Sequence, residues 1–373
     1  MSAAVAKGPF RYDIVGSFLR PARLKEARAG FAAGTVTREE LTAVEDEEIR
    51  SLVAREREAG LHAVTDGEFR RRWWHLDFLA GLEGITVYEF EASGFGVKKT
   101  MQNTYVSAPL AFSADHPFLD HFRFTQEVAG DALVKQTIPG PNMVTLDSVV
   151  LSAQYAENPV YADLDDLREG LAQAYRDAIR AFRDAGCRYL QLDDTSWGAL
   201  FSAPHRERIR KAGYDPDELI DVFGDITEAA LEGRPEDMTI TTHMCKGNFM
   251  SRWLYEGTYD NIARRLLAIE GFDGFFLEYD DERSGDFSPL RHLRDQRMVL
   301  GLVTTKSGEL EDPEAVKARI REATRWVPLE QLCLSPQCGF SSTEEGNAIE
   351  PEDQWRKLEL VRSIARDVWE DAD

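Results

Sequence analysis

Apolar residues along this chain gather in two kinds of segment: short β-branched or apolar runs, and longer stretches with helical spacing. The stretch 37–59 shows the helical kind, because Thr37 and Glu40 form a capping-box pattern and Gly60 ends the periodic run. Similar spacing predicts helices over 164–184, 215–231, 257–268, 313–324 and 351–370. The short runs predict eight strands, at 12–18, 61–69, 133–138, 189–192, 238–242, 274–277, 299–303 and 332–334.

Strands and helices alternate along the chain, and this alternation favours a parallel sheet. Eight β/α units in 373 residues fit a closed barrel, so we expect an α/β fold, a (β/α)8 TIM barrel that forms one catalytic domain over residues 1–373. The rhythm breaks at 84–127, where we expect a β-rich insertion after the second strand. The main alternative is an open doubly wound sheet, but no glycine-rich dinucleotide fingerprint follows any predicted strand.

Composition and charge exclude several classes of protein. The chain is 43% apolar, enough for a large core, and its formal net charge of −22 repels nucleic acid. No apolar run reaches the ~18 residues of a membrane span. Four cysteines are too few for a disulfide framework in a chain of this length. We therefore expect a cytoplasmic protein without nucleic-acid or membrane partners, and the sequence leaves a homo-oligomer open.

Two metal-binding residue types stand at the end of the predicted strand 238–242. His243 and Cys245 are two positions apart, so an extended chain directs both side chains to one face. Glu278 and Cys338 follow two other predicted strands, and a barrel gathers the carboxyl ends of its strands on one face. Imidazole, thiolate and carboxylate are zinc ligands, so these four residues predict a tetrahedral zinc site.

Further polar residues follow the remaining strands on the same side. They are Ser17, Asp66, Glu68, Asp193, Asp194, Thr304, Thr305 and Lys306. His75 lies just past the second strand and could reach the site, whereas Cys333 and Cys187 are interpreted as residues without a chemical role.

Seven short motifs, in order from about residue 11 to 340, together resemble the catalytic barrel of cobalamin-independent methionine synthase. They are Ile14-Val-Gly-Ser-Phe18, Asp66-Gly-Glu-Phe69, Pro139-Gly-Pro141, Gln191-Leu-Asp-Asp194, His243-Met-Cys245, Glu278 and Pro336-Gln-Cys-Gly339. Each motif is weak alone, but the ordered set is specific. The resemblance implies a Zn²⁺ ion bound by His243, Cys245, Glu278 and Cys338, on which a thiol substrate is activated.

The same resemblance implies that Ser17, Glu68 and Asp193 hold the amino-acid end of homocysteine. We count Asp194 with them as substrate-binding, and Asp193 and Lys306 as catalytic. The implied reaction moves a methyl group from a donor, methyltetrahydrofolate in the family, to homocysteine and gives methionine. Bound zinc deprotonates a thiol, and the resulting thiolate is the nucleophile.

Three departures from the family concern the donor. The chain has one barrel's worth of residues, where the full-length family enzyme has two barrels. The stretch Asn142–Asp147 lacks the tryptophan that stacks on the pterin in the family. Lys306 stands where the family has a proton-donating histidine, and we expect it to stay charged and to bind an anionic group of the donor or to stabilise a departing anion. The donor is therefore left open.

Two alternatives remain beside methyl transfer. One is alkylation of a zinc-bound thiol by an epoxide, as in epoxyalkane:coenzyme M transferase. That thiol carries a sulfonate and needs cations where Glu68 and Asp193 place anions, so the carboxylates favour an amino-bearing thiol. The other alternative is a zinc-binding barrel that catalyses no reaction.

Overall fold

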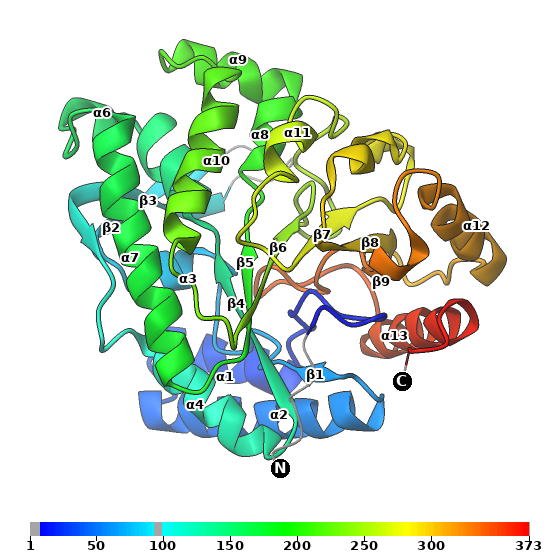
Figure 1. Cartoon of the computed structure of the whole chain (residues 1–373). Helices are drawn as coiled ribbons and strands as arrows, with labels where there is room; N and C mark the ends of the chain where they lie inside the picture. The colour runs from blue at the N-terminus through cyan, green and yellow to red at the C-terminus, as the bar shows by residue number, and fades with distance from the viewer. Residues whose placement is uncertain (1–7, 93–98, 373) are drawn as a thin grey trace.

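The computed structural model describes residues 8–92 and 99–372. Its centre is a curled parallel sheet of seven strands, flanked on the outside by helices (Figure 1). The strands are β1 Ala63–Val64, β4 Leu133–Pro139, β5 Tyr189–Asp193, β6 Thr239–Met244, β7 Gly274–Glu278, β8 Arg297–Val303 and β9 Leu332–Pro336, paired in this order. This α/β arrangement is consistent with the expected TIM-type barrel.

The first predicted strand, 12–18, is wrong as a regular strand. Within the described residues the segment makes one isolated bridge, between Tyr12 and Leu334 of β9. On its other side, the Phe18 backbone N–H donates to Gly67 O, at 3.1 Å, in the turn after β1. The segment therefore lies between the two edge strands, but Gly16, at φ 147°, bends it out of regular pairing.

The second predicted strand, 61–69, is also shorter than expected. β1 stops at Val64 because the chain turns at Asp66–Phe69, where Gly67 and Glu68 have φ of 62° and 60°. The Glu68 N–H donates to the Asp66 carboxylate at 2.8 Å, which closes this turn.

The predicted range 84–127 contains both a hairpin and a helix. Strands β2, Glu83–Ala92, and β3, Lys99–Ala111, pair antiparallel in a separate sheet. The remainder is not β-rich, because α4 occupies Pro117–Ala129. Pro117 occupies the first position of this helix, where proline is common, and it was the signal in the sequence for a helix start.

Most predicted helices are present, with shifted ends. The helices are α1 Ala22–Ala32, α2 Arg38–Glu58, α3 Leu76–Leu79, α5 Pro141–Met143, the π-helix η2 Val144–Val150, α6 Ala153–Glu157, α7 Leu164–Asp184, α8 Trp197–Phe201, α9 Ala203–Lys211, α10 Glu218–Leu231, α11 Ala263–Leu266, α12 Pro313–Ala323 and α13 Pro351–Val368, with short 3-10 turns at Glu282–Ser284, Ser288–His292 and Leu329–Gln331. The helix expected over 257–268 shrinks to α11. Helix α1 was missed because it buries only Leu24 and has no apolar face. Among the described residues, none of these helices has the length and hydrophobicity needed to cross a membrane.

A buried ion pair lies inside the curl of the sheet. Lys135 Nζ, with no exposed side-chain surface, is 3.2 Å from Asp13 Oδ1, and the Tyr189 hydroxyl donates to Asp13 Oδ2 at 2.7 Å. The ammonium also lies 4.0 Å from the centroid of the Phe276 ring. The pair joins β4 and β5 to the N-terminal segment, beneath the carboxyl ends of the strands.

We expect Lys135→Met to destabilise the fold by about 3–5 kcal/mol, because it leaves Asp13 charged and buried without its cation. The measurement is the urea midpoint of unfolding. Lys317→Met is the control, since Lys317 pairs with Glu314 and Asp367 at the surface and its loss should barely move the midpoint. Equal midpoints for the two variants would contradict a stabilising role for the buried pair.

Candidate metal centre and substrate cavity

Three of the four predicted metal ligands meet at the carboxyl ends of β6 and β9. His243 is the fifth residue of β6, and Cys245 follows its last residue. Cys338 comes two residues after β9. One ligand atom from each of the three lies within 4.8 Å of the others, and the two sulfur atoms are 3.5 Å apart. The His-x-Cys spacing thus brings an imidazole and a thiol to the same point, where the second thiol joins them.

The state of these side chains fits a metal ion. Both ring nitrogens of His243 are buried without a hydrogen-bond partner, a costly arrangement unless something else binds them. Both cysteines are buried and free. The hydrogen bond with Cys245 lowers the pKa of Cys338 well below its ordinary value, against the effect of burial and with further help from His243. A ready thiolate, a second thiol and an unpaired imidazole are the donor types that zinc prefers.

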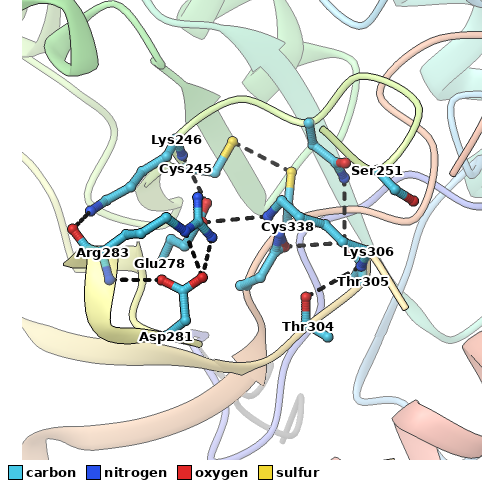
Figure 2. Close-up of polar contacts among 12 residues, drawn as sticks. Cys245, Lys246, Ser251, Glu278, Asp281, Arg283, Thr304, Thr305, Lys306 and Cys338 are labelled. Carbon is cyan, nitrogen blue, oxygen red and sulfur yellow. Dashed lines mark hydrogen bonds and ion pairs between the residues drawn. The ribbon is translucent and has the colours of Figure 1, made fainter. Parts of the chain in front are cut away.

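The fourth predicted ligand, Glu278, does not lie with the other three. Its side chain is fully buried, and its Oε2 accepts a hydrogen bond from the Lys246 backbone N–H at 2.8 Å. Its Oε1 faces Lys306 Nζ at 3.4 Å and the Arg283 guanidinium at 3.5 Å. Figure 2 shows this carboxylate turned to its two cations, while the sulfur atoms of Cys245 and Cys338 face each other.

Lys306 is therefore held by Glu278. Burial disfavours its charged form, but Glu278, Asp280 and the two thiols outweigh burial and raise the pKa of Lys306 above its ordinary value. This direction agrees with the expectation that Lys306 stays charged. The partner of Lys306 is not the expected one. The expectation was an anionic group of the donor, but the ammonium faces Glu278 and does not line the cavity described next.

A cavity of about 310 Å³ opens beside the three ligands and is of the size that small molecules occupy. It collects most of the predicted site residues: Ser17, Glu68, His75, Asp193, His243, Cys245 and Cys338 all line it. Three predicted site residues, Asp194, Glu278 and Lys306, do not. Ser17 reaches this position because Gly339 has no side chain: a Cβ there would lie 2.0 Å from the Ser17 hydroxyl oxygen.

Glu68 combines backbone strain with an unsatisfied charge. Its φ of 60° is rare for a residue other than glycine, and strain of this kind collects at functional sites. One carboxylate oxygen accepts from Thr137 at 3.0 Å and lies 3.3 Å from Arg71. The other oxygen is buried without a partner. Burial raises the pKa of the Glu68 carboxyl, although Arg71 and Arg20 oppose the shift. The free oxygen is available to a hydrogen-bond donor from a ligand.

The adjacent carboxylates Asp193 and Asp194 have different surroundings. Asp193 lines the cavity and accepts from the Gln191 side chain at 2.7 Å; burial raises its pKa to about 7, although His243 opposes the shift. Asp194 points away from the cavity. It accepts hydrogen bonds from the Ser196 hydroxyl and, at 3.2 Å, from the Ser196 N–H, and it packs against Gly140. Its contacts are those of a residue that shapes the turn after β5.

Several cavity residues had not been singled out from the sequence. They are Trp73, Trp74, Phe90, Met101, Gln102, Asn103, Met143, Leu146, Asp147, His205, Arg208, Phe249, Leu254 and Tyr255. Many come from connections and from the β2–β3 hairpin, where no periodic pattern marks a residue as facing inward. Arg71, which supports Glu68, was also missed; the run of three arginines after Phe69 was the only signal.

Comparison with known proteins places these residues in a family context. A family model described as the catalytic domain of cobalamin-independent synthase matches residues 11–358. The uncharacterized protein YxjH of Bacillus subtilis is 50% identical over 368 residues, covering 97% of this chain and 96% of that protein. A crystal structure from Listeria monocytogenes, provisionally described as a vitamin-B12-independent methionine synthase, is 40% identical and covers 98% of this chain and 99% of its own, with a TM-score of 0.77.

A more distant structure shares the fold. It is a B12-independent methionine synthase from Shewanella sp. W3-18-1 in complex with selenomethionine, 17% identical, covering 97% of this chain and 98% of its own, with a TM-score of 0.73.

We expect about one zinc ion per chain by metal analysis, bound through His243, Cys245 and Cys338. Cys245→Ser and Cys338→Ser should each lose most of the metal, because a neutral hydroxyl replaces a thiolate. Cys187→Ser is the matched control: Cys187 is also buried, but its thiol donates to the Tyr189 carbonyl at 3.3 Å, a bond that serine can keep. Full zinc in both site variants would overturn the assignment.

Proposed function

Because the chain belongs to the family of cobalamin-independent synthase catalytic domains, we propose that it is a zinc-dependent methyltransferase that methylates the sulfur of homocysteine and so forms methionine. One observation carries the proposal: an unpaired imidazole and two thiols face the same cavity as an unsatisfied carboxylate oxygen of Glu68. The relatives described as methionine synthases, one of them bound to selenomethionine, support the same reaction.

His243, Cys245 and Cys338 would hold the zinc, with Glu278 as the fourth ligand. When bound, the metal would keep a coordinated thiol as its nucleophilic thiolate. Glu278 already has an alternative position, since Lys306 and Arg283 balance its charge away from the other three side chains. We therefore assign Glu278 as the exchangeable ligand and Lys306 as the residue that receives its carboxylate.

Ser17, Glu68 and Asp193 would bind the amino-acid end of homocysteine. The free oxygen of Glu68 and the carboxylate of Asp193 suit the ammonium group, and Gln191 holds Asp193 in place. A positive charge at this point would offset the burial that raises the pKa of both carboxyls. The same charges disfavour a sulfonated thiol and hence the epoxide reaction. Asp194 is left out of this set because Ser196 occupies its carboxylate.

We also propose that the N-terminal segment serves as the eighth strand of a closed (β/α)8 barrel. Its bridge from Tyr12 to Leu334 and its hydrogen bond from Phe18 to Gly67 support this role. Its position between the two edge strands would deliver Ser17 to the substrate.

Glu68→Gln should weaken homocysteine binding by about 10- to 150-fold, the equivalent of one charged hydrogen bond of about 1.5–3 kcal/mol. Titration calorimetry of the zinc-loaded protein measures the affinity, and zinc content should not change. The control ligand is 4-mercaptobutyrate, which lacks the amino group and should bind the two proteins alike. If the unmutated protein binds both thiols equally, Glu68 does not recognise the ammonium.

Lys306→Met should lower the turnover number for methionine formation on the order of tenfold, because Glu278 loses one of its two cations. Lys306→Arg keeps the positive charge and should lose less. Both rates are measured with saturating homocysteine and a donor that supports turnover. A Lys306→Met rate within twofold of the unmutated protein would show that the ion pair has no part in the reaction.

A further inference from the structure

The structure holds a second recognition feature at the cavity, centred on Asp147. This residue lies in the π-helix η2, Val144–Val150, which buries all of its other residues and leaves Asp147 partly exposed at the cavity wall. π-Helical turns occur frequently at functional sites. No hydrogen bond or ion pair joins the Asp147 carboxylate to another of the described residues. Among the described residues, Arg208 acts on the Asp147 charge only from a distance, without a direct ion pair.

Aromatic side chains surround the same cavity. Trp73, Trp74, Phe90 and Tyr255 line it, and Trp73 stacks on Phe249 with ring centroids 5.7 Å apart. Burial raises the pKa of the Tyr255 hydroxyl, and Asp147 and Cys245 both add to the rise, so this ring lies near both groups. Aromatic faces together with a carboxylate are the surroundings in which proteins bind organic cations.

The balance of charge favours a cation as well. The described lining carries three carboxylates, Glu68, Asp147 and Asp193, against one guanidinium, that of Arg208, which is exposed on α9. Because Glu68 and Asp193 are assigned to the homocysteine ammonium, Asp147 is the carboxylate that is left for the donor. Burial raises the pKa of Asp147 to about 6, although Arg208 opposes the shift. A bound cation would stabilise the ionised form of Asp147.

Among the described residues that line the cavity, no histidine outside the proposed metal ligands is a cationic acid for a leaving group that needs a proton. Burial lowers the pKa of His75 to about 3 and, together with Arg208, that of His205 to about 4, so both imidazoles are neutral at physiological pH. Lys306 is paired with Glu278 and does not line the cavity. A donor whose leaving group departs as a neutral molecule needs no such acid.

Cavity size sets a further limit. A volume of about 310 Å³ is at the lower end for ligand pockets, and it must hold homocysteine and the reacting part of the donor together. A small donor fits this requirement.

From these observations we propose that the methyl donor is a small methylsulfonium compound, held with its cationic sulfur against Asp147 and the surrounding aromatic rings. The inference rests on the proposed function, whose donor it names. In the reaction, the homocysteine thiolate attacks the methyl carbon and forms a new sulfur–carbon bond. The donor's sulfur–methyl bond breaks, and its electron pair returns to the donor sulfur. A cation and an anion thus give two neutral thioethers, and no further reactant is required.

The first test is a donor comparison with the zinc-loaded full chain and ¹³C-labelled homocysteine. S-Methylmethionine, methyltetrahydrofolate as mono- and triglutamate, and methylcobalamin are each supplied, and labelled methionine is measured by mass spectrometry. We expect S-methylmethionine to support turnover at least tenfold faster than any other donor. Turnover with folate or methylcobalamin but not with the sulfonium would overturn this inference and leave the proposed function standing. No turnover with any donor would count against both.

The second test measures binding without turnover. Choline and 3,3-dimethylbutanol have the same shape and differ in the charge of the central atom. We expect choline to bind the unmutated protein at least tenfold more tightly by calorimetry, and Asp147→Asn to reduce this preference to less than threefold. Asp163→Asn is the matched control, since Asp163 caps α7 at the surface and asparagine caps a helix equally well.

Zinc content and homocysteine affinity should be the same in both variants, which separates a local effect from misfolding. Equal affinities of choline and its neutral isostere for the unmutated protein would overturn the proposal, as would a preference that survives Asp147→Asn.

Discussion

Two thiols and an imidazole meet in a buried space where neither ring nitrogen of the imidazole has a hydrogen-bond partner. His243 alone leaves two polar ring nitrogens unsatisfied, and such atoms cost free energy when they are shielded from water. The three side chains meet because parallel strands bring their carboxyl ends to one edge: His243 lies on β6, and Cys245 and Cys338 follow β6 and β9. A metal ion bound by these three side chains would satisfy the unpaired ring nitrogens, and its binding free energy would add to the stability of the fold.

Around this point the chain balances buried charges in two different ways. Glu278 is neutralised from within, by Lys306 and Arg283. Glu68 is only half satisfied: Arg71 and Thr137 hold one oxygen, and the strained turn at Gly67 and Glu68 keeps the other directed to the cavity. In the function that we propose, the satisfied carboxylate of Glu278 is the exchangeable ligand, and the free oxygen of Glu68 binds the substrate. Glu278 and Glu68 are both glutamates, so the difference between their proposed roles comes from the groups that each carboxylate contacts.

Partners of side chains were also the part of the site that the sequence did not predict, whereas most strands were predicted correctly. Strands β4 to β9 followed from short apolar runs. The shared face of His243 and Cys245 followed from the period of two, which leaves little choice about which side chains lie together. The pairing of Glu278 with Lys306, and the turning of Asp194 toward Ser196, depend on side-chain directions after a strand has ended, which no period governs. Two predictions were wrong for a similar reason: a regular strand over 12–18, and a β-rich range that in fact contains helix α4. Gly16 and Pro117 change the backbone locally, and the apolar pattern does not show such effects.

The two sides of the cavity are consequently built by different means. Of the residues proposed for the thiol and its metal, His243, Cys245, Cys338 and Asp193 stand on or just after strands, whereas Ser17 lies on the N-terminal segment and Glu68 in the turn after β1. Residues proposed for the donor stand on the π-helix η2, on the β2–β3 hairpin and on the segment at Trp73 and Trp74, which are connections between barrel elements. Connections accept substitutions and insertions far more readily than packed strands do. A barrel of this kind can therefore keep one way of activating a thiol while its loops change to bind another donor, which is what the proposed sulfonium donor requires.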